Sequence, residues 1–163
     1  MQRIIVLAFI LLISCSGIKQ NMNRNNKFTD SFFKSLSERN GNAFYIKSSY
    51  STFSTVWSYY KGDIVIYYIT NGKLQKKQKL DATNFLEKIA KKEVFELDKC
   101  LELDGDIIGY RVTINQQTYK EEFPIGINCF LNKKYESKFL NNLVKDIINY
   151  KLYKTDKINP RSH

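Results

Sequence analysis

Residues 52–80 read TFSTVWSYYKGDIVIYYITNGKLQKKQKL, and this stretch decides the fold. Three runs with strand-like composition or alternation are separated by Lys61-Gly62 and Asn71-Gly72. Asn-Gly between two such runs is the strongest short signal for a β-hairpin, because both residues of the turn need a positive φ. We therefore predict three consecutive antiparallel strands, at 52–60, 63–70 and 73–80.

The chain on either side of this meander alternates between helix and strand patterns. Upstream, apolar residues at helical spacing predict a helix over 30–40 that ends at Asn40-Gly41, and a strand over 43–48 follows. Downstream, the predicted elements are a helix over 81–92, strands over 97–103, 106–115 and 118–123, and a last helix over 136–151. The resulting fold class is α+β, with a mainly antiparallel sheet of about six to seven strands and three helices.

A nine-residue segment recurs at an offset of 43 residues. GDIVIYYIT at 62–70 aligns with GDIIGYRVT at 105–113, and five of the nine positions are identical. Both copies continue into a returning strand and then a helix, which predicts a duplicated three-strand meander plus helix. In this interpretation residues 97–103 and 106–115 pair across an Asp104-Gly105 turn. The alternative is convergence, because any Gly-Asp turn followed by β-branched residues gives a similar pattern.

The first fifteen residues have the layout of an export signal. Arg3 gives a short positive segment, and residues 4–13 are apolar without interruption, which suits a signal peptide and is too short to span a bilayer. Leu12-Ile13-Ser14-Cys15 follows directly and resembles the lipobox of bacterial lipoproteins. The resemblance implies cleavage after Ser14 and a diacylglycerol thioether on Cys15, whose acyl chains hold the protein to a membrane. The alternative is an ordinary secretory signal with a chance cysteine.

The export signal divides the chain into four segments. We expect 1–14 to be a signal peptide, 15–27 the lipidated cysteine with a disordered tether, 28–153 a single α+β domain, and 154–163 a disordered tail. The residue after Cys15 is Ser16, whereas an aspartate there resembles an inner-membrane retention signal of enteric bacteria. In a cell that has an outer membrane, this difference favours the periplasmic side of that membrane within the cell envelope.

The residue types that carry most catalytic and metal chemistry are scarce. His163, the last residue, is the one histidine of the sequence, which argues against a Ser-His-Asp triad and against a histidine zinc site. The acidic residues of 98–106 lack the glycine and the closing glutamate of an EF-hand loop. We therefore expect no catalytic residue, no metal site and no cofactor.

Two cysteines, Cys100 and Cys129, remain besides Cys15. Export would place both in an oxidising compartment, where such a pair tends to form a disulfide. We predict a Cys100–Cys129 bridge that stabilises the fold by about 3–4 kcal/mol in the loop-entropy description. The alternative is a pair of buried reduced thiols.

Strand alternation suggests a candidate binding surface. If both copies of the repeat keep the same orientation, Val56, Val65 and Tyr67 face the core in the first copy. The opposite face then combines aromatic and lysine side chains that suit a sugar or an acidic protein: Phe53, Trp57, Tyr59, Tyr68, Lys73, Lys77 and Lys79. The competing interpretation is that the helix over 30–40 covers this face and that the lysines only protect an edge strand.

Together these features predict a membrane-tethered lipoprotein with a non-catalytic binding domain, comparable to an inhibitor or immunity protein. The formal net charge of +10 favours an anionic partner, such as an acidic protein or an anionic glycan, and export argues against nucleic acid. The alternative is a structural lipoprotein of the envelope without a discrete ligand, and a hydrolase is a distant third.

Overall fold

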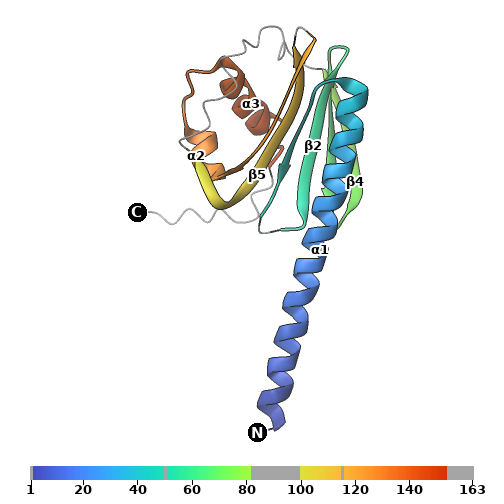
Figure 1. The fold of residues 1–163 in the computed structure, drawn as a ribbon, viewed down its shortest axis with the longest axis vertical. Coiled ribbons are helices and arrows are strands. Elements are labelled where there is room, and N and C mark those ends of the chain that lie inside the picture. Colours follow the sequence, from blue (N-terminus) through green and yellow to red (C-terminus); the bar gives the residue numbers. More distant parts are fainter. Residues whose placement is uncertain (1, 50, 82–99, 115, 154–163) are drawn as a thin grey trace.

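The computed structural model contains one antiparallel sheet with helices on both of its faces (Figure 1). It describes residues 2–49, 51–81, 100–114 and 116–153. The elements are α1 (Gln2–Asn40), β1 (Ala43–Lys47), β2 (Phe53–Tyr60), β3 (Asp63–Thr70), β4 (Lys73–Asp81), β5 (Leu101–Ile114), β6 (Gln117–Ile125), α2 (Ile127–Asn132) and α3 (Lys138–Asn149). The strand order is β4-β3-β2-β1-β5-β6. The predicted α+β class is therefore confirmed, whereas the predicted helix over 81–92, beyond Asp81, and the tail over 154–163 lie outside the described residues.

Both predicted hairpin turns of the meander are present. Lys61 and Gly62 have φ angles of 51° and 83°, and Asn71 and Gly72 have φ angles of 52° and 70°. Two successive residues of positive φ give the twist that matches flanking antiparallel strands. The turns join β2, β3 and β4 in the predicted order.

Each face of the sheet carries a hydrophobic cluster. One row of paired residues crosses β3, β2, β1 and β5 and lies in the larger cluster with α3: Ile66, Trp57, Phe44 and Tyr110. The next row along the strands points the other way, toward α1: Tyr67, Val56, Tyr45 and Gly109. Successive residues of a strand alternate between faces, so these two rows define the α3 face and the α1 face of the sheet.

Residues 101–114 form one continuous strand, so the predicted hairpin at Asp104-Gly105 is wrong. Leu101 and Asp106 both pair with Ile125 of β6, and the residues between them form a bulge. A Cβ atom on Gly105 would lie 2.3 Å from the carbonyl oxygen of Ile125, so β6 runs directly against this point. The bulge leaves Leu103 97% exposed at one end of the sheet.

The predicted duplication of a meander is wrong for a related reason. β5 lies between β1 and β6, whereas its counterpart β3 lies between β2 and β4. The strand that pairs with β5 on the side away from β6 is therefore β1, which comes before β2, β3 and β4 in the chain. The duplication required the predicted strand over 97–103 in that position. Its residues 101–103 belong to β5, and residues 97–99 lie outside the described part.

α1 is a continuous helix that contains the predicted helix over 30–40 and ends, as predicted, at Asn40. Figure 1 shows the first half of α1 projecting from the domain and the second half lying along the sheet. The expected disordered tether over 15–27 is corrected, because this range is helical and Asn25 is fully buried within it. Among the described residues, no helix is long and apolar enough to cross a membrane.

The chain after β6 forms two helices that are tied to the start of β5. The predicted disulfide is present and joins Cys100, just before β5, to Cys129 in α2, with a Cα–Cα distance of 5.6 Å. The segment around Cys129, predicted as a loop, is in part the short helix α2. α3 confirms the predicted last helix with shorter bounds, and the Ser137 hydroxyl caps it by accepting a hydrogen bond from the Leu140 N–H at 3.2 Å.

Candidate functional site

The predicted exposure of Trp57 is wrong. Trp57 is 0% exposed and its ring stacks on Phe44 at a centroid distance of 5.6 Å. Tyr59 is buried beside it, and Phe139 of α3 packs against Phe44 from above the sheet. The cover is α3, and α1 lies on the opposite face, so the competing interpretation, in which the first helix buries Trp57, is also wrong.

The other predicted site residues are divided between the two faces. Lys77 and Lys79 pair with Tyr67 and Val65 and therefore lie on the α1 face. The register of β3 and β4 shifts between Tyr68 and Ile69, so these two lysines do not share a face with Lys73. Lys73 remains exposed on the α3 side, opposite Thr70. Lys79 is also held by Asp63 at 2.8 Å.

Phe53 and Tyr68 are the predicted site residues that stay together beside open space. Their rings lie 6.4 Å apart on the α3 face, and the Lys76 ammonium is 5.9 Å from the centre of the Tyr68 ring. They line a shallow recess of about 540 Å³ with Thr70, Asn71, Gln75 and Lys76. This recess is a remnant of the predicted surface at the turn between β3 and β4.

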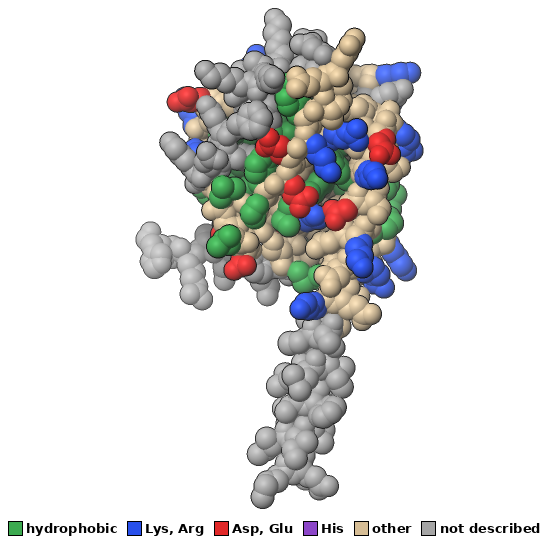
Figure 2. Space-filling view, viewed as in Figure 1, with side chains coloured by type: hydrophobic (Ala, Val, Ile, Leu, Met, Phe, Trp, Pro, Cys, Tyr) green, Lys and Arg blue, Asp and Glu red, His purple; other side chains and the backbone are tan. Residues whose placement is uncertain are grey.

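A polar cleft that the sequence did not reveal lies on the α1 face. In the described part of the chain α1 packs along β1, β2 and β3 and leaves the β5 and β6 side of this face open. The resulting space, of about 350 Å³, is the α1–β6 cleft, lined by Asp30, Ser31, Phe33, Lys34, Ser37, Tyr45, Arg111, Lys120, Glu121 and Glu122. Acidic side chains lie near the middle of the same face in Figure 2, with basic ones mainly on the α1 side.

The floor of the cleft depends on one row of three paired residues. Tyr45 of β1 pairs with Gly109 of β5, which pairs with Glu122 of β6. A Cβ atom on Gly109 would lie 2.3 Å from the Tyr45 ring, so the glycine lets that ring lie flat across β5. The Tyr45 hydroxyl thereby reaches Glu122 and donates a hydrogen bond to its carboxylate. Burial, with help from Glu122, raises the pKa of Tyr45 far above its ordinary value, so the hydroxyl remains the donor.

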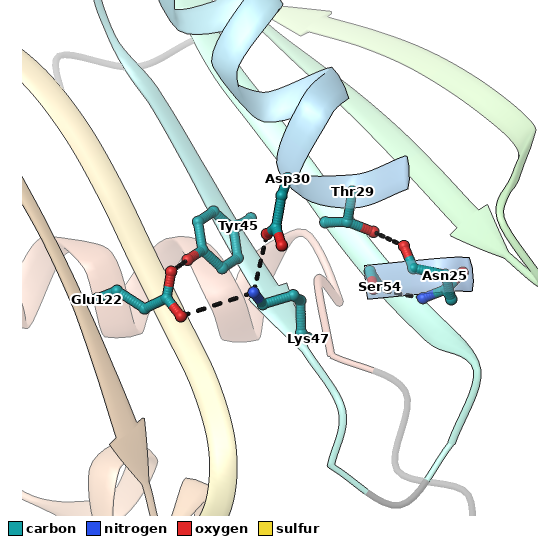
Figure 3. Close-up of polar contacts among 7 residues, drawn as sticks. All are labelled: Asn25, Thr29, Asp30, Tyr45, Lys47, Ser54 and Glu122. Atoms are coloured by element: carbon teal, nitrogen blue, oxygen red, sulfur yellow. Dashed lines mark hydrogen bonds and ion pairs between the residues drawn. The ribbon is translucent and has the colours of Figure 1, made fainter. Parts of the chain in front are cut away.

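A buried lysine joins the helix to this floor (Figure 3). Lys47 is 5% exposed, and its ammonium lies 2.8 Å from the Asp30 carboxylate of α1 and 3.7 Å from that of Glu122. The ammonium also lies 4.9 Å from the centre of the Tyr45 ring. Two carboxylates and an aromatic face surround the charge, as a buried ammonium requires. The network therefore holds the cleft in shape.

A second polar contact fixes α1 at the end where it meets the sheet (Figure 3). The buried Asn25 amide donates to the Ser54 hydroxyl at 2.7 Å and accepts from the Gly72 N–H at 3.0 Å. The Thr29 hydroxyl donates to the Asn25 carbonyl at 2.8 Å. These bonds determine the direction in which the first half of α1 leaves the domain.

The acidic stretch near the start of β5 does not form a metal site in the described residues. Asp106 is buried and accepts hydrogen bonds from the Ser49 N–H at 2.8 Å and from the Tyr153 hydroxyl at 2.7 Å. Glu102 and Asp104 are exposed on the bulge. The described part of the chain contains no group of three or more His, Cys, Asp or Glu side chains that could hold a metal ion. Asp106 is thus a structural acceptor that holds the bulge.

Neither a family model, nor a curated protein, nor a solved structure matches this chain. The cleft therefore has to be interpreted from its own geometry. One sequence signal could have indicated it, since Gly109 replaces Ile66 of the aligned copy within a strand. A glycine inside a strand often marks a close approach by another group.

Proposed function

We propose that this chain is a membrane-tethered lipoprotein, anchored through lipid on Cys15, whose domain binds a protein partner in the α1–β6 cleft without catalysis. The observation that carries the proposal is that the two halves of α1 lie in different surroundings. Its first half projects from the domain toward Cys15, and its second half covers only part of one sheet face (Figure 1). One helix thus connects the expected anchor to the wall of the cleft.

The charges of the cleft favour a protein segment over an anionic glycan. Three cations, Lys34, Arg111 and Lys120, face the cleft with two acids, Asp30 and Glu122. The acids would repel an anionic glycan, whereas a polypeptide with both signs of charge can satisfy both sets. The Phe33 and Tyr45 rings supply an apolar floor between them.

The polar network supports binding over catalysis. In the described part of the cleft the acids Asp30 and Glu122 are engaged with Lys47 and Tyr45. Activation of a nucleophile needs a base within hydrogen-bond reach that is itself available. Side chains locked by one another are instead suited to present a preorganised surface.

Site-specific photo-crosslinking in cells tests the binding site. A photoreactive residue at Lys120, on the cleft, should give a discrete adduct that Arg111→Glu abolishes. The matched control is Lys145, which is exposed on α3 at the other face of the sheet. Adducts of equal yield from both positions, or an adduct indifferent to Arg111→Glu, would exclude the cleft as the binding site.

The anchor is tested separately by Cys15→Ala. The variant should move from the membrane pellet to the soluble or unprocessed fraction, because no acyl chain can be attached. Normal processing with an unchanged membrane fraction would refute the lipid anchor. The periplasmic side of the outer membrane is the proposed location, following Ser16 after the cysteine.

A structural envelope lipoprotein without a discrete ligand is the second candidate. It is favoured by the burial of Trp57 and Tyr59 under α3, since the aromatic face is used within the chain. On this alternative, Cys15→Ala should disturb the envelope while Arg111→Glu should not. A binding domain should lose function with either change.

A further inference from the structure

We infer that the end of the domain at which α1 enters rests on an anionic lipid surface, through a basic patch that contacts the headgroups. The basic patch consists of Lys19, Arg24, Lys27, Lys73 and Lys76, all of them exposed. The orientation of the patch rests on the proposed anchor at Cys15. The inference adds to that anchor a second, electrostatic contact with the same membrane.

The direction of α1 relative to the sheet is fixed at this end. Asn25 bonds to Ser54 at the start of β2 and to Gly72 in the turn between β3 and β4. A Cβ atom on Gly72 would lie 2.9 Å from Cγ of Arg24, so the turn also lies directly against the helix. The β3–β4 turn therefore lies at the end of the domain that faces back toward Cys15.

The distance from Cys15 brings the patch close to a bilayer. An α-helix rises 1.5 Å per residue, so the helical segment from Cys15 to Asn25 measures about 15 Å. The headgroup layer occupies roughly 5–7 Å of each leaflet beyond the hydrocarbon. Lys19 and Arg24 lie on this segment, and the patch therefore falls within about one Debye length, roughly 8 Å, of the charged surface.

We call the place where α1 meets the β3–β4 turn the joint, and the charged side chains of α1 near it have one sign. Residues 15–29 contain three cations and no acid. The first acid along α1 is Asp30, whose carboxylate is held by Lys47 at 2.8 Å. The exposed acids Glu102 and Asp104 lie at the same end of the sheet but on the β5 side, and β3, β2 and β1 separate β5 from β4.

Protection of an edge strand does not account for this patch. β4 is an edge strand of the sheet, and lysines on an edge strand can act simply to prevent pairing with another chain. Lys19, Arg24 and Lys27 are on a helix, where no strand edge needs protection. What the helical and β4 cations share is their position beside the joint, which favours a membrane over a protein partner.

Vesicle binding without a lipid anchor tests the inference. The protein is the chain from residue 15 onward carrying Cys15→Ser, which retains Asn25 and the part of α1 that packs on the sheet. It should sediment with vesicles that contain phosphatidylglycerol, stay in solution with phosphatidylcholine alone, and dissociate as salt is raised. The triple variant Arg24→Gln/Lys27→Gln/Lys73→Gln should bind about 100-fold more weakly, since each basic residue near an anionic surface contributes about fivefold.

The matched control removes three exposed lysines elsewhere. Lys134→Gln/Lys138→Gln/Lys145→Gln changes the net charge equally and should leave binding within about twofold, because contact is local. Equal losses in both variants, equal binding to neutral vesicles, or no binding at all would overturn the inference. Because the tested chain carries no lipid, the outcome is independent of whether Cys15→Ala refutes the anchor in cells.

Discussion

Gly109→Ala is the substitution that most directly tests the construction of the cleft. The Tyr45 ring lies across Gly109, and the added methyl carbon would sit 2.3 Å from two of its ring atoms. The ring is 2% exposed and contacts Phe33 edge to face at 4.7 Å on its other side. It can make room only by moving into the cleft, away from Glu122.

Two costs then combine in the free energy of unfolding. Forcing one extra methyl group into a packed site costs about 1–3 kcal/mol. Loss of a hydrogen bond to a charged group costs about 1.5–3 kcal/mol. The two costs overlap, because one movement of the Tyr45 ring relieves the clash and breaks the bond. We expect a total loss of about 3 kcal/mol.

Urea unfolding followed by circular dichroism measures this loss, and a double-mutant cycle assigns it. In a Tyr45→Ala background the clash is absent, and Gly109→Ala should be neutral or stabilising by about 0.5 kcal/mol. Gly17→Ala is the control, because a Cβ atom there meets nothing within 4 Å. If Gly109→Ala costs as much in the Tyr45→Ala background as in the unchanged protein, the close approach of the ring is not what the glycine serves.

Two further predictions concern the α3 face and the disulfide. Burial, only partly offset by a hydrogen bond from Tyr59, raises the pKa of Asp146 to about 6. This value exceeds the pKa of about 4 in the unfolded chain. The Asp146 contribution to stability should therefore be fully present below about pH 4 and lost as pH rises through about 6. Asp146→Asn should flatten this part of the pH profile of urea unfolding, and an unaltered profile would contradict the prediction. Reduction of Cys100–Cys129, which closes a separation of 29 residues, should lower the free energy of unfolding by about 3–4 kcal/mol, and intact mass after alkylation should show the bridge in envelope-derived protein.

The local features of the fold were predictable because their causes lie within a few residues. Lys61-Gly62 and Asn71-Gly72 set the turns through their own backbone preferences. Asn40-Gly41 ended the first helix in the same way, with the Gly41 N–H bonded to the Ser37 carbonyl at 2.9 Å. The disulfide followed from composition and expected compartment, which need no knowledge of the fold.

The bulge in β5 shows where local signals mislead. Asp104-Gly105 resembles a hairpin turn, yet Gly105 is needed there because a Cβ atom would lie 2.3 Å from the Ile125 carbonyl oxygen of β6. Asp106, one of the acidic residues of 98–106, accepts two hydrogen bonds within the domain. Both residues have roles determined by segments distant in sequence, and a turn pattern carries no information about them.

The assignment of faces failed through the pairing of β1. β1 joins β2 on one side and β5 on the other, and it places Trp57, Phe44 and Tyr110 in one row. The aligned copies equate Tyr110 with Tyr67, which lies one residue further along β3 and on the opposite face. A shift of one residue exchanges the faces of a strand. The similarity of the two segments therefore led to inverted faces in the first copy, whose strands had been predicted from their own turns.

The same pairing explains why the cleft could not be predicted. Its floor joins residue 45 to residues 109 and 122, and its wall comes from Asp30, so four separate segments must be placed before any two of its charges meet. In the sequence, Lys47 and Glu122 are ordinary surface charges, and only the glycine at 109 marks a close approach. The position of α1 decides the rest. The part of the α1 face formed by β5 and β6 is polar, and α1, anchored by Asn25, does not cover it. The feature that turns charged strand residues into a cleft is thus the tilt of one helix, which is set by contacts at its far end.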